Sequence, residues 1–215
     1  MLCKRFVAAI LVLTFVFMGT LLFAQSVIPI LQIYQLKEGE TVEATGVVLV
    51  APGALMNKTT WIQDGTAGIM IYGNLPELKI GDAIRVSGKT KIYYGILEIL
   101  PDKVEIIGKA EVKPVDLNKL FAEEAKKGTL TKQKIGELFN SLLSQLVTVT
   151  GQIVDIQGYQ FTVKTDYFEI LIYLRKEANI STKNLKKGQT ISVTGIMYLY
   201  KDVFEILPRF QDDIK

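Results

Sequence analysis

The sequence predicts an all-β protein made of two five-stranded barrels in tandem, joined by a helical linker. The first observation is an internal repeat: residues 78–101, LKIGDAIRVSGKTKIYYGILEILP, align without a gap with residues 185–208, LKKGQTISVTGIMYLYKDVFEILP. The second is that each copy belongs to a set of five segments with the two-residue alternation of β-strands. The third is a stretch between the copies in which apolar residues follow helical spacing. The chain is therefore interpreted as a duplication in which each copy supplies one barrel.

The first 24 residues have the composition of a signal peptide. Two basic residues, Lys4 and Arg5, precede an uncharged apolar run that ends at Ala24. We expect export to the periplasm or the extracellular space, with a mature chain that begins near Gln25 and has no membrane span. Residues 6–23 are also about long enough to cross a bilayer, so an uncleaved N-terminal anchor is the alternative. N-terminal sequencing separates the two.

The amino-acid composition argues against several kinds of catalytic and metal-binding site in the chain that follows the predicted signal peptide. The single cysteine, Cys3, precedes the apolar run, and the chain has no histidine. Disulfides, thiol nucleophiles, histidine bases and the commonest zinc ligands are therefore not expected. The 25 basic and 22 acidic residues are nearly balanced once Lys4 and Arg5 are removed, which is unlike the broad positive surface of many nucleic-acid-binding proteins. We expect no catalytic residue, no metal and no cofactor.

Residues 31–112 are expected to form the first barrel. A turn-forming segment, NLPEL, separates its third strand from its fourth. Gly46 lies inside the first strand, where a small barrel often needs a bulge or a bend to close. Five strands with an interruption after the third match the OB-fold, a partly open five-stranded barrel. The strands are predicted at residues 41–50, 59–63, 68–72, 82–93 and 96–107.

The stretch TWIQDGTAGIMIY, residues 60–72, contains an acidic residue and two glycines between two apolar runs. Its DGTAG segment is predicted to be a hairpin turn, because Asp and Gly tolerate the backbone angles of tight turns. A phosphate-binding loop would require a lysine and a following helix, and an aspartic-protease site would require a second D-[ST]-G motif. Neither is found in the sequence, so we expect no catalytic role for this loop.

Residues 113–143 are expected to form the helical linker. Asp116 and Thr131 are typical N-caps for two helices. The second helix is expected to pack on a barrel or to bridge the two barrels, rather than to bind a membrane surface or a partner helix. Its apolar stripe consists of Ile135, Leu138, Phe139, Leu142 and Leu143.

Residues 144–211 are expected to form the second barrel. The lysine-rich connection after its third strand is interpreted as a solvated loop, with a weak, salt-sensitive contact to an anionic polymer as the alternative. Glu98 and Glu205 match in the repeat, and each is interpreted as a packing or edge residue because acid–base chemistry needs a partner group. The strands are predicted at residues 146–155, 159–164, 168–174, 189–200 and 203–207.

Strand alternation selects a candidate binding face on the first barrel. If the isoleucines of its second and third strands point inward, the outer face of these strands is the surface on which OB-folds usually bind ligands. Aromatic rings there could stack on bases or sugars, and basic residues on the fourth strand could contact a phosphate backbone. The alternative is that Trp61 packs against the linker helix and that the charged strand is only solvated. The candidate ligand-binding residues are Trp61, Gln63, Met70, Tyr72, Arg85, Lys89, Lys91, Tyr93 and Tyr94.

The first repeat resembles the OB modules of exported bacterial proteins, including those that accompany secreted nucleases. The resemblance rests on the V-x-x-T-G-x-V strand, WIQDGTAGIMIY, LKIGDAIRVSGK and YYGILEI, and it covers residues 41–107 well and 146–207 more loosely. It implies association with nucleic acid, whereas the nuclease chemistry of those proteins belongs to other domains. We therefore expect a non-enzymatic binding protein whose first barrel binds single-stranded nucleic acid. The alternative is a cell-envelope adaptor or structural protein that binds protein or oligosaccharide.

Overall fold

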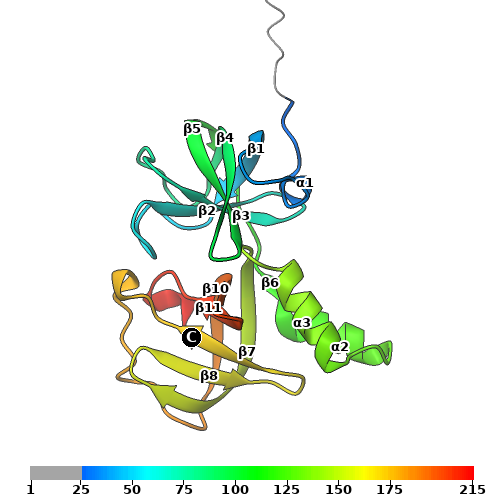
Figure 1. Cartoon of the computed structure of the whole chain (residues 1–215). Helices are drawn as coiled ribbons and strands as arrows, with labels where there is room; N and C mark the ends of the chain where they lie inside the picture. The colour runs from blue at the N-terminus through cyan, green and yellow to red at the C-terminus, as the bar shows by residue number, and fades with distance from the viewer. Residues whose placement is uncertain (1–25) are drawn as a thin grey trace, which may run out of the picture.

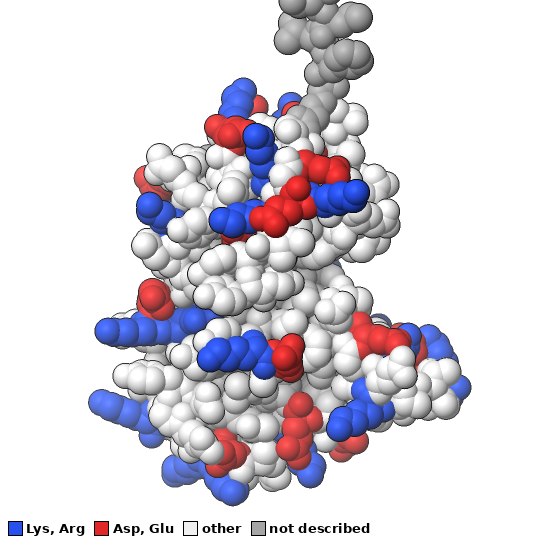
Figure 2. Space-filling model, in the orientation of Figure 1, with Lys and Arg blue, Asp and Glu red and all other residues white. Residues whose placement is uncertain are grey.

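The computed structural model describes residues 26–215, so the predicted signal peptide lies outside the described residues and stays a prediction. Two barrels lie one above the other, and a pair of helices stands beside the lower one (Figure 1). Figure 2 shows acidic and basic side chains distributed over both barrels, with a largely uncharged band where the barrels meet. Within the described part of the chain, no helix is long and apolar enough to cross a membrane.

The first barrel is a closed sheet with the strand order β1-β2-β3-β5-β4. The sheet closes because β1 pairs with both β2 and β4, and β3 runs parallel to β5. This order is that of the predicted OB-fold, which is confirmed for the first repeat. A short helix, α1 (Ile30–Ile33), precedes the barrel. The strands are β1 (Thr41–Val48), β2 (Thr59–Gln63), β3 (Gly68–Tyr72), β4 (Asp82–Tyr93) and β5 (Ile96–Lys109).

In the first barrel a shift of strand register lies at Gly88, and the pairing of β1 with β4 has none at Gly46. The register between β4 and β5 shifts next to Gly88, where an added Cβ would lie 2.1 Å from the carbonyl oxygen of Leu100. Gly195, its repeat partner, approaches the carbonyl oxygen of Leu207 in the same way, at 2.5 Å. The fourth and fifth strands therefore approach each other closely at a glycine in both repeats, where a side chain would not fit.

The predicted hairpin at DGTAG is confirmed, since β2 and β3 pair antiparallel on either side of it. The Oδ1 atom of Asp64 accepts hydrogen bonds from the backbone nitrogens of Thr66 and Ala67, at 2.7 and 2.9 Å. Its Oδ2 atom accepts from the backbone nitrogen of Ile30, at 2.8 Å, and so holds α1 against the turn. Burial alone would raise the pKa of Asp64, but these hydrogen bonds to the ionised form lower it.

The second barrel has the equivalent strand order, β10-β11-β9-β8-β7, and closes where β10 pairs with β7. Tyr93 and Tyr200 occupy the same place, at the ends of β4 and β10, as the repeat alignment predicts. The short strand β6 (Val115–Asp116), which runs parallel to β7, was not expected. The remaining elements are β7 (Leu146–Gln157), β8 (Gln160–Lys164), β9 (Glu169–Tyr173), β10 (Thr190–Tyr200), β11 (Val203–Leu207), η1 (Lys176–Ala178) and η2 (Gln211–Asp213).

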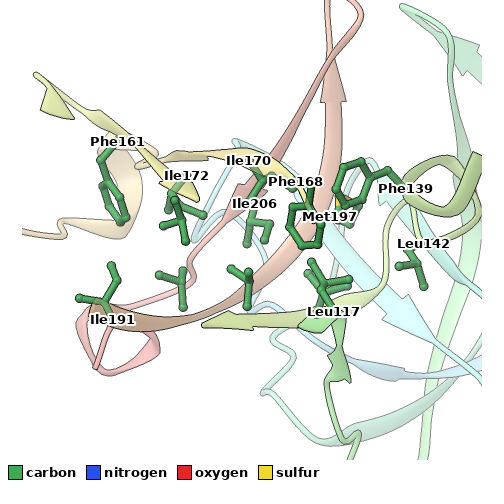
Figure 3. Packing of buried hydrophobic residues seen from close by; sticks show 14 of the residues in the cluster. Leu117, Phe139, Leu142, Phe161, Phe168, Ile170, Ile172, Ile191, Met197 and Ile206 are labelled. Carbon is green, nitrogen blue, oxygen red and sulfur yellow. The ribbon is translucent and has the colours of Figure 1, made fainter. Parts of the chain in front are cut away.

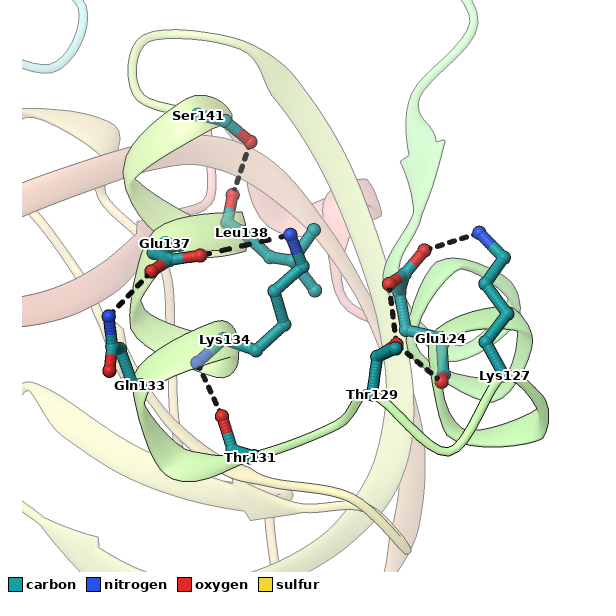
Figure 4. A network of polar contacts seen from close by, with 9 residues as sticks. All are labelled: Glu124, Lys127, Thr129, Thr131, Gln133, Lys134, Glu137, Leu138 and Ser141. Atoms are coloured by element: carbon teal, nitrogen blue, oxygen red, sulfur yellow. Dashed lines mark hydrogen bonds and ion pairs between the residues drawn. The ribbon is translucent and has the colours of Figure 1, made fainter.

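Two helices, α2 (Leu117–Lys126) and α3 (Lys132–Ser141), form the linker. Both predicted N-caps are confirmed: Asp116 accepts a hydrogen bond from the backbone nitrogen of Lys119, and Thr131 accepts one from that of Lys134, each at 3.1 Å. Figure 4 shows the Thr131 cap together with the polar contacts that follow it along α3.

The linker helices pack on the core of the second barrel. Phe121 of α2 and Phe139 of α3 place their rings 4.4 and 5.1 Å from that of Phe168. Figure 3 shows Phe139, Leu142 and Leu117 at one end of the row of apolar side chains that fills this barrel. The expectation that the apolar stripe of the second helix packs on a barrel is confirmed.

Candidate functional site

The two barrels share an apolar interface. Trp61 of β2 is fully buried, and its ring meets that of Tyr198 of β10 edge-on, with centroids 6.5 Å apart. The Oε1 atom of Gln63 accepts a hydrogen bond from the backbone nitrogen of Leu146 at 2.9 Å, which ties β2 to the start of β7. The interface cluster consists of Leu49, Val50, Leu55, Trp61, Met70, Ile96, Leu146, Ile196, Tyr198 and Leu207.

This interface covers much of the predicted binding face. The predicted alternation is right, because the isoleucines of β2 and β3 line the barrel interior while Trp61 and Met70 lie outside it. The expectation that this outer face is open is wrong at three positions: Trp61, Gln63 and Met70 are only 0, 8 and 1 % exposed. The alternative prediction, that Trp61 is a packing residue, is confirmed. Its packing partner is the second barrel, however, and not the linker helix.

A depression of about 400 Å³ remains open beside the interface, on the first barrel. It lies between the loop from β1 to β2 and the β4–β5 hairpin, and it brings together four of the predicted residues. Tyr72 and Tyr93 are 42 and 51 % exposed, and the neighbouring Tyr94 meets the ring of Tyr93 edge-on at 4.5 Å. We name it the Tyr72–Tyr93 depression; its lining residues are Met56, Asn57, Thr59, Met70, Tyr72, Lys91, Tyr93 and Glu98.

Strand pairing places Glu98 at the centre of the Tyr72–Tyr93 depression. On β5, Glu98 lies opposite Met70 of β3 on one side and opposite Lys91 of β4 on the other. Tyr72 is two residues beyond Met70, and Tyr93 is two residues beyond Lys91 on a strand that runs the other way. Because residues two apart share a face, both tyrosines lie on the same face as Glu98, each displaced from it by two residues in opposite strand directions.

The other predicted basic residues do not join this site. Arg85 lies farther along β4, and its Nε atom is 3.5 Å from Oε1 of Glu43. Lys89 is exposed and does not line the Tyr72–Tyr93 depression. Within residues 26–215, no group of three or more histidine, cysteine, aspartate or glutamate side chains could hold a metal ion.

Glu98 is a site residue that the sequence analysis did not select. It is 2 % exposed, and burial raises its pKa although the charge of Lys91 opposes the change. Burial also raises the pKa of its repeat partner Glu205, but there Nη2 of Arg175 lies 3.7 Å from Oε1. No basic nitrogen of the described residues lies within 4.0 Å of the Glu98 carboxylate. The repeat-equivalent carboxylates therefore differ: one has a cationic partner, and the other faces the depression.

We expect Glu98→Gln to raise the free energy of unfolding at pH 7 by an amount on the order of 1 kcal/mol. The pKa of Glu98 is higher in the folded state than in the unfolded state, because burial disfavours the ionised carboxylate. Wild-type stability therefore falls as pH rises through the unfolded-state pKa, and it stays lower above the folded-state pKa. Chemical denaturation at pH 7 and at pH 3 should show a difference between the two proteins only at pH 7. Glu111→Gln, at an exposed position, is the control, and an equal difference at both pH values would contradict the desolvation argument.

No family model matches the chain. It is 28 % identical over 168 residues to Endonuclease YhcR of Bacillus subtilis (strain 168), and the match covers 73 % of this chain but only 13 % of that relative. The chain thus spans a small part of the length of the curated relative.

Several solved structures are similar to parts of the chain. The second OB-fold domain of replication protein A from Methanococcus maripaludis is 26 % identical with a TM-score of 0.28, covering 37 % of this chain and 96 % of that one. The ygiW protein of E. coli is 13 % identical with a TM-score of 0.33, covering 38 % and 90 %. A murine DNA-binding protein bound to double-stranded DNA is 9 % identical with a TM-score of 0.35, covering 77 % and 92 %. On the strand order and closure of its own two barrels, the chain is a tandem of OB-folds.

Proposed function

We propose that this is an exported, non-catalytic binding protein that holds single-stranded nucleic acid in the Tyr72–Tyr93 depression. The observation that carries the proposal is that two exposed tyrosines and Lys91 meet in one depression on the OB face. Tyrosine rings stack on bases of any kind, and an ammonium group pairs with phosphate. The loops that frame the depression, β1 to β2 and β4 to β5, are the ones with which OB-folds bind oligonucleotides.

The shape of the site favours a single strand over a duplex. In a duplex the faces of the bases are stacked on one another, so a tyrosine ring cannot reach them. A single strand can turn a base into a depression of this size without losing base pairs.

The similarity to Endonuclease YhcR supports nucleic acid as the class of ligand. Because the chain spans 13 % of that protein, cleavage is not proposed for it. Cleavage of single-stranded DNA by the purified chain, with and without Mg²⁺, would contradict the non-catalytic part of the proposal.

Tyr72→Ala and Tyr93→Ala should each weaken the binding of single-stranded DNA by about 1–3 kcal/mol, the range measured for the loss of one base stack. The measurement is the fluorescence anisotropy of a labelled twelve-residue oligothymidine at low salt. Tyr159→Ala is the matched control, because this tyrosine is 68 % exposed but lies at the β7–β8 turn of the other barrel. Failure of the wild-type protein to bind any single-stranded DNA or RNA at low salt would overturn the proposal and favour the envelope adaptor.

A further inference from the structure

A buried carboxylate lies in the Tyr72–Tyr93 depression. Glu98 lines the depression with only 2 % of its surface exposed, whereas the equivalent Glu205 has Arg175 beside it. Burying a carboxylate without a close cation is unfavourable, and such groups are found preferentially where a ligand supplies the missing partner. The chemistry of Glu98 therefore indicates which base the depression accepts.

An ionised carboxylate only accepts hydrogen bonds, and its two oxygens can accept two at once from adjacent donors. On the Watson–Crick edge, guanine alone among the common bases has two adjacent donors, N1–H and the N2 amino group. Adenine and cytosine have an amino donor beside a ring-nitrogen acceptor, and thymine and uracil have one N3–H donor between two carbonyl acceptors. A carboxylate can thus accept two hydrogen bonds from guanine. With each of the other bases, at least one acceptor atom would face a carboxylate oxygen, which also only accepts.

We propose that the Tyr72–Tyr93 depression is a subsite for an unpaired guanine, in which the Glu98 carboxylate accepts hydrogen bonds from N1–H and N2–H. The two tyrosines lie on either side of Glu98 along the strands and supply aromatic rings for the base, and Lys91, opposite Glu98 on β4, supplies an ammonium group for a phosphate of the same strand. This inference rests on the proposed binding of single-stranded nucleic acid. In a duplex the same guanine edge is already paired with cytosine.

The second barrel does not repeat this arrangement. The positions of Met70 and Lys91 are occupied there by Leu171 and Tyr198, which lie opposite Glu205 on β9 and β10. Arg175 also lies over the ring of Tyr198, at 5.4 Å from its centroid, so the carboxylate and its surroundings are already partnered. Guanine recognition is therefore confined to the first barrel, and Glu205 provides an internal control.

The test uses the full chain and labelled twelve-residue oligothymidines in which one central base is thymine, guanine, inosine, adenine or cytosine. A single guanine should tighten wild-type binding about tenfold over thymine, within the range known for bidentate base contacts. Inosine keeps N1–H but lacks the N2 amino group, so it should lose about threefold or more of that gain. Adenine and cytosine should bind about as thymine does.

Glu98→Gln presents one acceptor and one donor, so it should reduce the guanine preference to about twofold or less. The preference is the ratio of the guanine to the thymine affinity of the same variant, so a change in its overall affinity for DNA does not affect the comparison, and Glu205→Gln should keep the preference. Equal wild-type binding of all five oligonucleotides, or a preference that survives Glu98→Gln, would overturn the guanine subsite and leave the proposed function intact. Absence of binding to every oligonucleotide would instead overturn both. The inosine comparison uses only the wild-type protein, so it does not depend on how a variant folds.

Discussion

Trp61→Ala should lower the free energy of unfolding by about 3–5 kcal/mol, the range for removal of a fully buried tryptophan. The indole fills the interface between the barrels and meets Tyr198 edge-on, so its removal leaves a cavity that two rigid sheets cannot easily close. Guanidinium denaturation followed by far-ultraviolet circular dichroism measures the loss. The two barrels should then unfold in separate steps, because the variant weakens the interface that couples them.

Two matched variants sharpen this test. Trp61→Phe should cost much less than Trp61→Ala, because it keeps most of the ring and removes an Nε1–H that is buried without a hydrogen-bond partner among the described residues. Tyr94→Ala removes an 86 % exposed ring and should change stability by no more than about 0.5 kcal/mol. A Trp61→Ala protein as stable as the wild type would show that the barrels do not dock through β2 in solution. The same geometry makes Trp61 fluorescence a reporter of barrel docking rather than of ligand contact.

Gly68→Ala should destabilise the protein by about 3 kcal/mol, at the upper end of the range for inserting a methyl group where there is no space. A Cβ on Gly68 would lie 2.1 Å from the carbonyl oxygen of Ser144 and 2.8 Å from the nitrogen of Gln145. That segment cannot move away freely, because the nitrogen of Ser144 donates to the carbonyl oxygen of Met197 at 2.8 Å.

Gly65→Ala is the control for Gly68→Ala. It adds the same methyl group to the same hairpin, but no atom lies within 4 Å of the new Cβ. Thermal denaturation of the two variants should therefore give a large shift for Gly68 and a small one for Gly65. Equal melting temperatures would mean that the chain around Ser144 does not approach β3 as the structure shows.

The barrels were predictable because their signals are local or are repeated. Strand alternation, the N-caps Asp116 and Thr131, and the duplicated segment each report on neighbouring residues, and all are confirmed. The short strand β6 was not predicted, because two residues are too few to show the alternation of polar and apolar residues that identifies a strand.

The candidate site was only partly predictable. Alternation distinguishes the inside of a barrel from its outside, but it does not reveal what covers the outside. Trp61 and Met70, two large apolar residues paired on an outer face, were a signal that another surface packs there. Glu98 was interpreted as a packing or edge residue because the sequence shows no partner group for acid–base chemistry. The structure gives Glu98 and Glu205 different surroundings through residues far away in the chain, Arg175 among them.

The shared interface of the two barrels also bears on the entropy of recognition. Tandem modules on a flexible tether gain avidity by engaging two stretches of one polymer, and they lose freedom of relative motion when they do so. Here the packing of Trp61 against Tyr198 and the bond between Gln63 and Leu146 have already removed that freedom during folding. A ligand thus binds a preorganised surface, and its affinity does not increase through a second binding module that moves independently. A rigid pair of barrels is therefore suited to distinguishing one short polymer segment from another rather than to binding a long segment.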